Sequence, residues 1–226
     1  VAGHTLPTPF YGDVEIVEYI NSKNVTVKFN NTGYIATAQL NNIINGRLRD
    51  KLAPYIYGVG IVGDEVCSVE GEPLREYVIW QGMLRRCYCE TFKERNPTYI
   101  DCKTSNNFKY FPYFKSWCKD QIGFNDPDFQ LDKDILLKGN KVYCEDLCVF
   151  VPKDVNLLFT KRDSKRGECL IGVTYVERDK KYRVNLSVKG RKLINKYFNT
   201  EHEAFQAYKT SKELYIKDVA EKWKGK

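Results

Sequence analysis

The sequence predicts an α+β protein that is divided into several modules. Alternating apolar and polar residues in 14–35 and 171–198 predict antiparallel strands near both ends of the chain. Between them, apolar residues recur every three to four positions in 77–87 and 108–118, which is helical spacing. A basic stretch without apolar residues, 161–168, predicts a domain boundary. We therefore expect a β-module at 10–53, a central domain at 75–160 and a third domain at 168–224.

The length and composition favour a globular protein that stays in water. With 226 residues and 42% hydrophobic residues, the chain can form one large domain or two to three small ones. No apolar run approaches the roughly 20 residues that cross a bilayer, and no signal peptide opens the sequence. We expect a cytoplasmic protein without a membrane partner.

The positive charge lies in the last third of the chain. The net charge is +7, and from Lys161 onward there are 18 Lys and Arg residues against 9 Asp and Glu. The preceding 160 residues hold 18 against 20. A neutral body with a basic end favours a polyanionic partner, most simply double-stranded DNA. The alternative is a solvated, lysine-rich surface, but the basic residues follow a strand pattern and we favour binding.

The first module is expected to be a small sheet. Residues 1–9 are interpreted as a loose leading segment, and strands are expected in 14–20, in 25–29 and from residue 34. The clusters 21–24 and 30–33 have the composition of turns. The module is either a DNA contact, through Lys23, Lys28, Arg47 and Arg49, or a structural cap.

Aromatic residues dominate the centre of the chain. In 77–87, Trp80, Met83, Leu84 and Cys87 fall on one side of the expected helix. In 108–118, Phe111, Phe114 and Trp117 recur at the same spacing. Such a stripe is more often core than a surface for stacking bases, so we assign it to the core.

The segment 131–156 carries the residues best suited to bind a metal ion or to catalyse a reaction. Asp132 and Asp134 precede a turn at 138–140, an apolar strand follows at 149–151, and Pro152 is expected in the first turn of a short helix that reaches Asn156. A strand pair followed by a helix, with an acid early and an amide late, can hold one divalent cation against a phosphate. On charge alone, the plainer interpretation is a hairpin with a solvated turn.

The last domain is expected to be three antiparallel strands backed by one helix. The strands fall at 171–176, 182–188 and 192–198, with a turn at Gly190. Thr200 and Glu203 have the spacing of a capping box, and the helix that they open should end near Trp223.

This last domain resembles the Apetala/ethylene-response-factor type of DNA-binding domain. The resemblance covers roughly 55 residues and rests on GVTY at 172–175, KYRV at 181–184, KYFNT at 196–200 and EAFQAY at 203–208. In that family the sheet lies in the major groove. By position, the residues implied to meet DNA are Arg183, Asn185, Lys189, Arg191, Lys192 and Lys196. A guanidinium can pair with guanine edges, whereas lysines mostly neutralise phosphates.

The middle of the chain is similar to phage HNH endonucleases of the homing type. About 80 residues carry the similarity, with Trp80, Met83, Arg86-Cys87, Tyr99 and Cys102, then LDKD at 131–134 and Gly139-Asn140. The resemblance implies a ββα-metal fold with one Mg²⁺ or Mn²⁺ ion. Asp132 falls at the first metal-ligand position and Asn156 near the third. Asp146 falls at the middle position, which orients the catalytic base.

One departure from the HNH pattern affects catalysis directly. The family's general-base histidine position is Lys133, and the two histidines of the chain, His4 and His202, lie far from it in the sequence. Imidazole suits proton transfer near neutral pH, whereas an ammonium needs a strongly lowered pKa. Three outcomes stay open: Lys133 or Asp134 acts as the base, the metal activates water without a separate base, or cleavage is lost.

Eight cysteines are scattered through the chain, without the pattern of a secreted disulfide framework. Cys87, Cys102 and Cys148 match positions at which related phage sequences carry cysteine, and Cys89 or Cys144 could supply a fourth ligand for a structural Zn²⁺. The spacing is not that of paired zinc knuckles. The alternative, which that spacing favours, is buried thiols acting as small apolar residues.

Together these features predict a site-specific, divalent-metal-dependent DNA endonuclease of phage type. The central domain would hydrolyse the phosphodiester bond, and the basic sheet would choose the site. If the chain is phage-encoded, the compartment is the host cytoplasm. The competing hypothesis is a catalytically inactive, sequence-specific DNA-binding protein, either a repressor or a domesticated nuclease.

Overall fold

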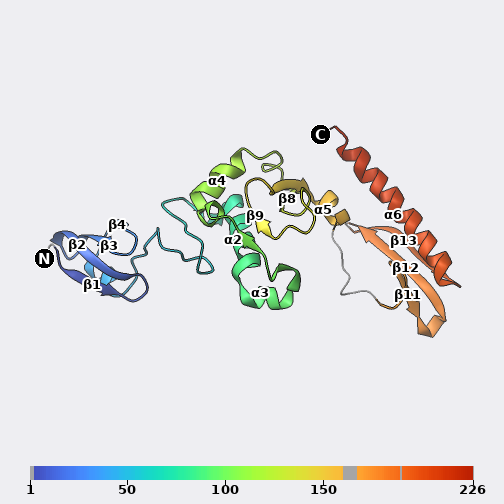
Figure 1. Cartoon of the computed structure of the whole chain (residues 1–226), viewed down its shortest axis with the longest axis horizontal. Coiled ribbons are helices and arrows are strands. Elements are labelled where there is room, and N and C mark those ends of the chain that lie inside the picture. Colours follow the sequence, from blue (N-terminus) through green and yellow to red (C-terminus); the bar gives the residue numbers. More distant parts are fainter. Residues whose placement is uncertain (1–2, 160–166, 189, 226) are drawn as a thin grey trace. The chain divides into compact units, whose positions relative to one another are not determined.

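The computed structural model describes residues 3–159, 167–188 and 190–225, and confirms a mixed α and β protein (Figure 1). The chain divides into two compact units, Val1–Phe150 and Val151–Lys226. Among the described residues, no helix is both long and apolar enough to cross a membrane.

The N-terminal part of the first unit is a four-stranded antiparallel sheet in the order β1-β2-β3-β4. Its strands are β1 (Thr5–Thr8), β2 (Gly12–Asn21), β3 (Asn24–Phe29) and β4 (Ile35–Ala38), followed by the short helix α1 (Leu40–Ile44). Alternation buries Val25, Val27 and Phe29 on one face of β3, where they pack with Val14 and Ile43.

The first strand corrects the expectation of a loose leading segment. Thr5 to Thr8 pair with β2, and the His4 carbonyl accepts a hydrogen bond from the Ile16 amide at 2.9 Å. The segment TLPT has little apolar content, and its proline resembles a linker residue. A proline is nevertheless tolerated here because β1 is an edge strand. One side of an edge strand has no neighbouring strand, so a residue there can lack an amide donor.

The centre of the first unit is helical and holds the largest apolar cluster. It contains α2 (Arg75–Tyr88), α3 (Glu90–Arg95), η1 (Pro97–Tyr99), η2 (Asn107–Lys109) and α4 (Phe111–Lys119), preceded by the small hairpin β5 (Ser68–Val69) and β6 (Glu72–Pro73). Trp80, Met83 and Leu84 of α2 are fully buried with Phe111 and Phe114 of α4. The expected aromatic stripe is therefore core.

Short strands connect this core to the candidate site. β7 (Lys103–Thr104) pairs in parallel with β9 (Val142–Tyr143), and β8 (Phe129–Asp132) pairs with β10 (Val149–Pro152). The helix α5 (Lys153–Phe159) follows directly. Pro152 ends β10 rather than opening the helix, so the expected boundary was wrong by one residue, a common uncertainty at helix ends.

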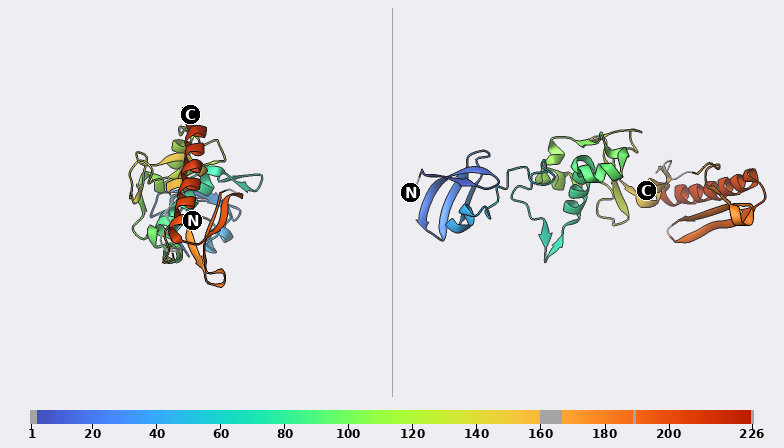
Figure 2. Two further views of the ribbon diagram at one scale, coloured as in Figure 1. Left: turned by 90° about the vertical axis from the view of Figure 1, so that its right-hand side faces the viewer. Right: turned by 90° about the horizontal axis from the view of Figure 1, so that it is seen from below.

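The expected C-terminal sheet and helix are confirmed. β11 (Val173–Val176), β12 (Lys181–Val188) and β13 (Arg191–Phe198) form an antiparallel sheet, with η4 (Glu177–Asp179) between the first two, and α6 (Glu201–Trp223) lies along one face (Figure 2). The capping box is also confirmed, because the Thr200 hydroxyl accepts from the Glu203 amide at 3.3 Å and the Glu203 carboxylate accepts from the Thr200 amide at 3.2 Å. The buried core of this sheet is Val173, Val184 and Ala204.

The division between the two units falls at 150/151, whereas the sequence suggested 161–168. Residues 160–166 of that expected boundary lie outside the described part of the chain. In the second unit α5 is tied to the end of α6 through Asp154, which is 5% exposed. Its carboxylate accepts from Lys222 Nζ at 2.8 Å and from Trp223 Nε1 at 2.9 Å.

Candidate functional site

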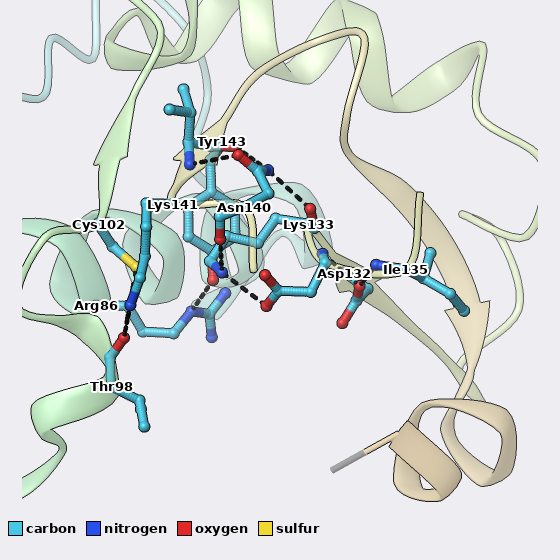
Figure 3. A network of polar contacts seen from close by, with 11 residues as sticks. Arg86, Thr98, Cys102, Asp132, Lys133, Ile135, Asn140, Lys141 and Tyr143 are labelled. Atoms are coloured by element: carbon cyan, nitrogen blue, oxygen red, sulfur yellow. Dashed lines mark hydrogen bonds and ion pairs between the residues drawn. The ribbon is translucent and has the colours of Figure 1, made fainter. Parts of the chain in front are cut away.

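The acidic candidates of the first unit lie on one turn, residues 132–142. Asp132 is the last residue of β8, and its Oδ1 accepts hydrogen bonds from the main-chain amides of Asp134 and Ile135, both at 2.7 Å (Figure 3). An aspartate in this position folds the chain back at the end of a strand. Its carboxylate is half-buried and fixed in direction by the turn that it stabilises.

Lys133 lies at the centre of this turn and is buried, with 6% exposure. Its Nζ donates to Asp134 Oδ2 at 2.7 Å and to the Asn140 carbonyl at 2.6 Å, and lies 5.7 Å from the centroid of the Tyr143 ring. A buried ammonium is tolerated only when such partners replace its water shell. In both hydrogen bonds Lys133 is the donor, so it links the two ends of the turn.

Asn140 completes the link and was absent from the residues singled out for chemistry. It is 8% exposed. Its Nδ2 donates to the carbonyls of Lys133 and Val142 at 2.8 and 2.7 Å, and its Oδ1 accepts from the Val142 amide at 2.9 Å. In the sequence, Gly139-Asn140 belongs to the HNH-like pattern, and no local feature marks the Asn140 amide as a structural bridge.

The side chain of Arg86, on α2, supports the turn through Tyr143. Arg86 Nε donates to the Tyr143 hydroxyl at 2.9 Å, and its guanidinium lies 5.4 Å from the centroid of the same ring. Burial raises the pKa of Tyr143 above its ordinary range, which keeps the hydroxyl neutral. Lys141 donates to the Thr98 carbonyl at 2.8 Å. Lys138 is exposed on the same turn.

The other nuclease candidates fall into different surroundings. Asp146 is exposed in the turn between β9 and β10. Asn156 is half-buried on α5, which belongs to the second unit, whereas Asp132 belongs to the first. The oxygen donors of Asp132 and Asp134 suit a hard cation such as Mg²⁺ or Mn²⁺, and Asp134 is 49% exposed at its side chain. These residues fit the implied ion chemically.

The three candidate zinc ligands share one apolar cluster. Cys87, Cys102 and Cys148 are all buried within it. Burial raises the pKa of Cys87 to about 12, with Cys102 adding to the effect, and burial also raises the pKa of Cys148 to about 12. Within the described ranges, no group of three His, Cys, Asp or Glu residues is arranged to hold a metal ion. The structural zinc site stays a prediction.

The sheet of the second unit has one face covered by α6 and one open face. Register partners in an antiparallel sheet point to the same side. Because Val184 is buried against the helix, Arg183 and Asn185 point to the open face, and so do their partners Tyr197 and Asn195. Arg183 Nε donates to Asn195 Oδ1 at 3.1 Å, and its guanidinium lies 5.7 Å from the centroid of the Tyr197 ring.

The register separates the six DNA-contact candidates. Lys196 is paired with the buried Val184, and Arg191 with Val188, so both belong to the helix side, where Lys196 stays exposed at the edge strand β13. Lys192 pairs with Ser187 and shares the open face. Lys189 lies outside the described residues. Alternation alone could not place the residues of β13, because its pairing shifts between Leu186 and Ser187 and leaves Leu193 without a partner position.

A pocket opens beside this face. It has a volume of about 390 Å³, and Cys169, Leu170, Ile171 and Thr174 line it together with Arg183 and Asn185. Cys169, Leu170 and Ile171 thus form an apolar wall next to two side chains with hydrogen-bonding groups. Such a combination could distinguish the methyl group and the polar edges of bases.

Comparisons with protein-family models, with curated proteins and with solved structures give no match for this chain.

Proposed function

We propose that the protein is a DNA-binding, divalent-metal-dependent endonuclease. Its central ββα-metal domain would be of the HNH type, and its sheet and helix of the Apetala/ethylene-response-factor type would grip the duplex. The observation that carries the proposal is the fixed turn at 132–142. It holds two carboxylates, Asp132 and Asp134, beside a cross-linked lysine on a rigid aromatic core.

In this proposal Asp132 would hold the cation, because the turn amides fix the direction of its carboxylate. Asn156 is the second ligand that the resemblance to HNH endonucleases implies. The bound ion would supply charge stabilisation for the phosphate and the leaving 3′ oxygen. The role of this chain is to fix the direction of the acids, which limits the reorganisation needed during the reaction.

Of the two candidate bases, the contacts favour Asp134 over Lys133. A base must accept a proton, and the Lys133 ammonium is engaged as a donor to Asp134 and to the Asn140 carbonyl. Asp134 is an acceptor with 49% of its side chain exposed, so water can reach it. Lys133 is then a positioning residue that orients this carboxylate. Asp146, the remaining candidate, is proposed to act through orientation of the base.

Duplex recognition is proposed for the open face of β11, β12 and β13. Arg183 and Asn185 supply base-edge donors and acceptors, and Lys192 supplies charge for the phosphates. The basic balance of the last third of the chain supports this assignment. Arg191 and Lys196 lie on the helix side and are proposed to contribute only long-range charge. Lys189, which lies outside the described residues, stays a sequence-based candidate.

A non-catalytic DNA-binding protein is the second candidate, and one observation favours it. Neither histidine takes part in the turn at 132–142, since His4 precedes β1 and His202 lies in the first turn of α6. Lys133 at the base position is built into the turn as a cross-link. A chain that kept the fold only to position its DNA-binding sheet would have no need for a base there.

A plasmid nicking assay with Mg²⁺ or Mn²⁺ separates the two candidates. The informative variant is Asp132→Asn, because its Oδ1 can still accept from the turn amides while the negative charge that holds a cation is lost. The exposed Asp120→Asn on the first unit is the matched control. The endonuclease proposal expects cutting by the wild type and the control but not by Asp132→Asn. Equal DNA binding without cutting in all three proteins supports the non-catalytic candidate.

A further inference from the structure

The N-terminal sheet carries a pocket that the proposed nuclease does not use. It has a volume of about 870 Å³ and lies among the β1–β2 turn, the β3–β4 turn and the segment after α1. Its lining includes Phe10, Tyr11, Arg47, Arg49, Asp50 and Tyr55. Pockets of this size are typical of small-molecule and nucleotide sites.

Glycines hold the loops around the pocket close together. A Cβ on Gly46, at φ +66°, would lie 2.7 Å from the ring of Pro9, and a Cβ on Gly12, at φ +76°, would lie 2.6 Å from Asn31 Nδ2. The positive φ therefore favours glycine at both places, and at Gly46 the Pro9 ring also leaves no space for a side chain. The Thr8 hydroxyl donates to the Gly12 carbonyl at 2.6 Å and fixes the turn that carries Phe10. The pocket is built by tight contacts between its loops.

The buried acid of the pocket, Asp50, holds two of its loops together through hydrogen bonds. Asp50 is 2% exposed, and its carboxylate accepts from the Thr32 hydroxyl at 2.6 Å and from the Leu52 amide at 2.9 Å. It joins the β3–β4 turn to the segment after α1. Its oxygens are used inside the fold, and its negative charge offsets only one of the two exposed guanidinium groups, Arg47 and Arg49, so the lining stays positively charged. The pocket is suited to an anion.

Two aromatic rings at the pocket are left exposed to water. Phe10 is 78% exposed and Tyr55 is 51% exposed. The guanidinium of Arg49 lies 4.9 Å from the centroid of the Tyr55 ring and forms a flat platform with it. Flat aromatic and guanidinium surfaces beside positive charge are the features on which unpaired bases stack while their phosphates are neutralised.

We propose that this pocket binds an unpaired strand of nucleic acid. A base would stack on Phe10 or on the Arg49–Tyr55 platform, and Arg47 would contact the adjoining phosphate. A duplex would leave the rings unused, because its bases are already stacked on each other. The proposal goes beyond the endonuclease and does not depend on cleavage or on the C-terminal sheet.

The test uses the full chain and a fluorescent oligothymidylate of about ten nucleotides, with anisotropy as the readout at low salt. Phe10→Ala and Tyr55→Ala should each weaken binding roughly 5- to 100-fold, the loss expected for one stacked base. Arg47→Gln should weaken binding and reduce its salt dependence. Phe10→Tyr, which keeps a ring, should bind like the wild type.

Matched controls lie outside the pocket on the same unit. Tyr19, 39% exposed on β2, is replaced in Tyr19→Ala, and the exposed Lys119 at the end of α4 is replaced in Lys119→Gln. Both should bind the strand like the wild type. An oligouridylate that binds with the same pattern of variants also supports the proposal, and identifies RNA as a strand that fits.

Three results would overturn the proposal: no binding of the strand by the wild type, unchanged binding by the pocket variants, or equal competition by polyglutamate. The last result would assign the pocket to acidic chains without stacking. Arg183→Ala separates this test from the proposed function, because it should lower duplex affinity and leave oligothymidylate affinity unchanged. Loss of nicking in Asp132→Asn would likewise leave the result intact.

Discussion

Lys133 and Asn140 bind each other in both directions. The lysine Nζ donates to the asparagine carbonyl at 2.6 Å, and the asparagine Nδ2 donates to the lysine carbonyl at 2.8 Å. Both residues are buried, so water does not compete for these groups. The reciprocal pair closes the turn that carries Asp132 and Asp134, and it connects the proposed chemistry directly to the stability of the turn.

Replacement of Lys133 by methionine should destabilise the first unit by about 2 kcal/mol. The variant leaves the Asn140 carbonyl without its charged donor, and hydrogen bonds to charged groups contribute roughly 1.5–3 kcal/mol. Urea unfolding followed by tryptophan fluorescence measures the change, because Trp80 and Trp117 belong to this unit. Lys138→Met, at an exposed lysine of the same turn, is the control. Equal stability of the two variants would show that the hydrogen bonds of Lys133 do not stabilise the first unit.

Removal of the Asp154 carboxylate should loosen the second unit. Asp154→Ala deprives Lys222 and Trp223 of their acceptor and should cost about 2–4 kcal/mol, since one partner of a partly buried ion pair is lost. Hydrogen exchange of α5 and of the last turns of α6 should rise first. Asp218→Ala, at an exposed aspartate on α6, should change neither the stability of the second unit nor the exchange rates of these helices. Protection that stays at the wild-type level in Asp154→Ala would contradict this role.

Glu145 should make the stability of the first unit depend on pH. Burial raises the pKa of its carboxyl, but hydrogen bonds from its own amide and from Asn107, Ser105 and Tyr113 outweigh burial and lower the pKa below 4.5. A carboxyl with a depressed folded pKa adds stability above its unfolded pKa and loses that contribution as the pH falls through its folded pKa. Between about pH 7 and about pH 3, the stability difference between wild type and Glu145→Gln should therefore shrink. A constant difference over this range would contradict the assignment.

Alkylation should distinguish the cysteines by their surroundings. A hydrogen bond with Thr91 lowers the pKa of Cys89, whereas burial raises the pKa of Cys87 and Cys148 to about 12. Because the thiolate is the reactive form, iodoacetamide should modify Cys89 well before the two buried thiols. Peptide mass spectrometry at successive times gives the order. Equally fast modification of Cys148 would show that the apolar cluster opens readily or that its thiol is ionised.

Duplex binding should depend on which face of the sheet a basic residue occupies. Arg183→Ala should weaken specific binding by about 1–3 kcal/mol, and Lys192→Ala should lower the salt slope by about one. Lys196→Ala should have a smaller effect on the affinity and on the salt slope, because Val184, the register partner of Lys196, faces the helix. Arg178→Ala, at an exposed arginine of η4, is the control for lost charge. Equal effects of Lys192→Ala and Lys196→Ala would contradict the assignment of faces.

Local signals were sufficient for much of the fold. The alternation in β12, the aromatic spacing of α2 and α4, and the Thr200–Glu203 cap are short-range patterns, and the structure contains each of them. By contrast, β1 was missed because pairing with β2, and not its own composition, makes Thr5–Thr8 a strand. The ties of Asp154 to Lys222 and Trp223 were missed for the same reason, since they join residues about 70 positions apart.

The candidate site shows a similar limit. The sequence singles out Asp132, Lys133 and Asp134 as candidates for chemistry, but it does not reveal that Lys133 is buried and bound to the Asn140 carbonyl. Burial of the Lys133 side chain depends on Tyr143 and Arg86, which reach the turn from β9 and α2. The pocket beside Phe10 was missed because three separate loops form it.

The shift in pairing between Leu186 and Ser187 has a consequence for how this sheet could change its target. Because Leu193 is the extra residue, Lys192 lies opposite Ser187; with regular pairing the leucine would lie opposite Ser187 and the lysine opposite Val188. Closing the bulge would thus exchange an ammonium for an aliphatic group on the open face, with every side chain of the domain retained. The pairing register, as much as substitution, could therefore diversify what such a sheet presents to a partner.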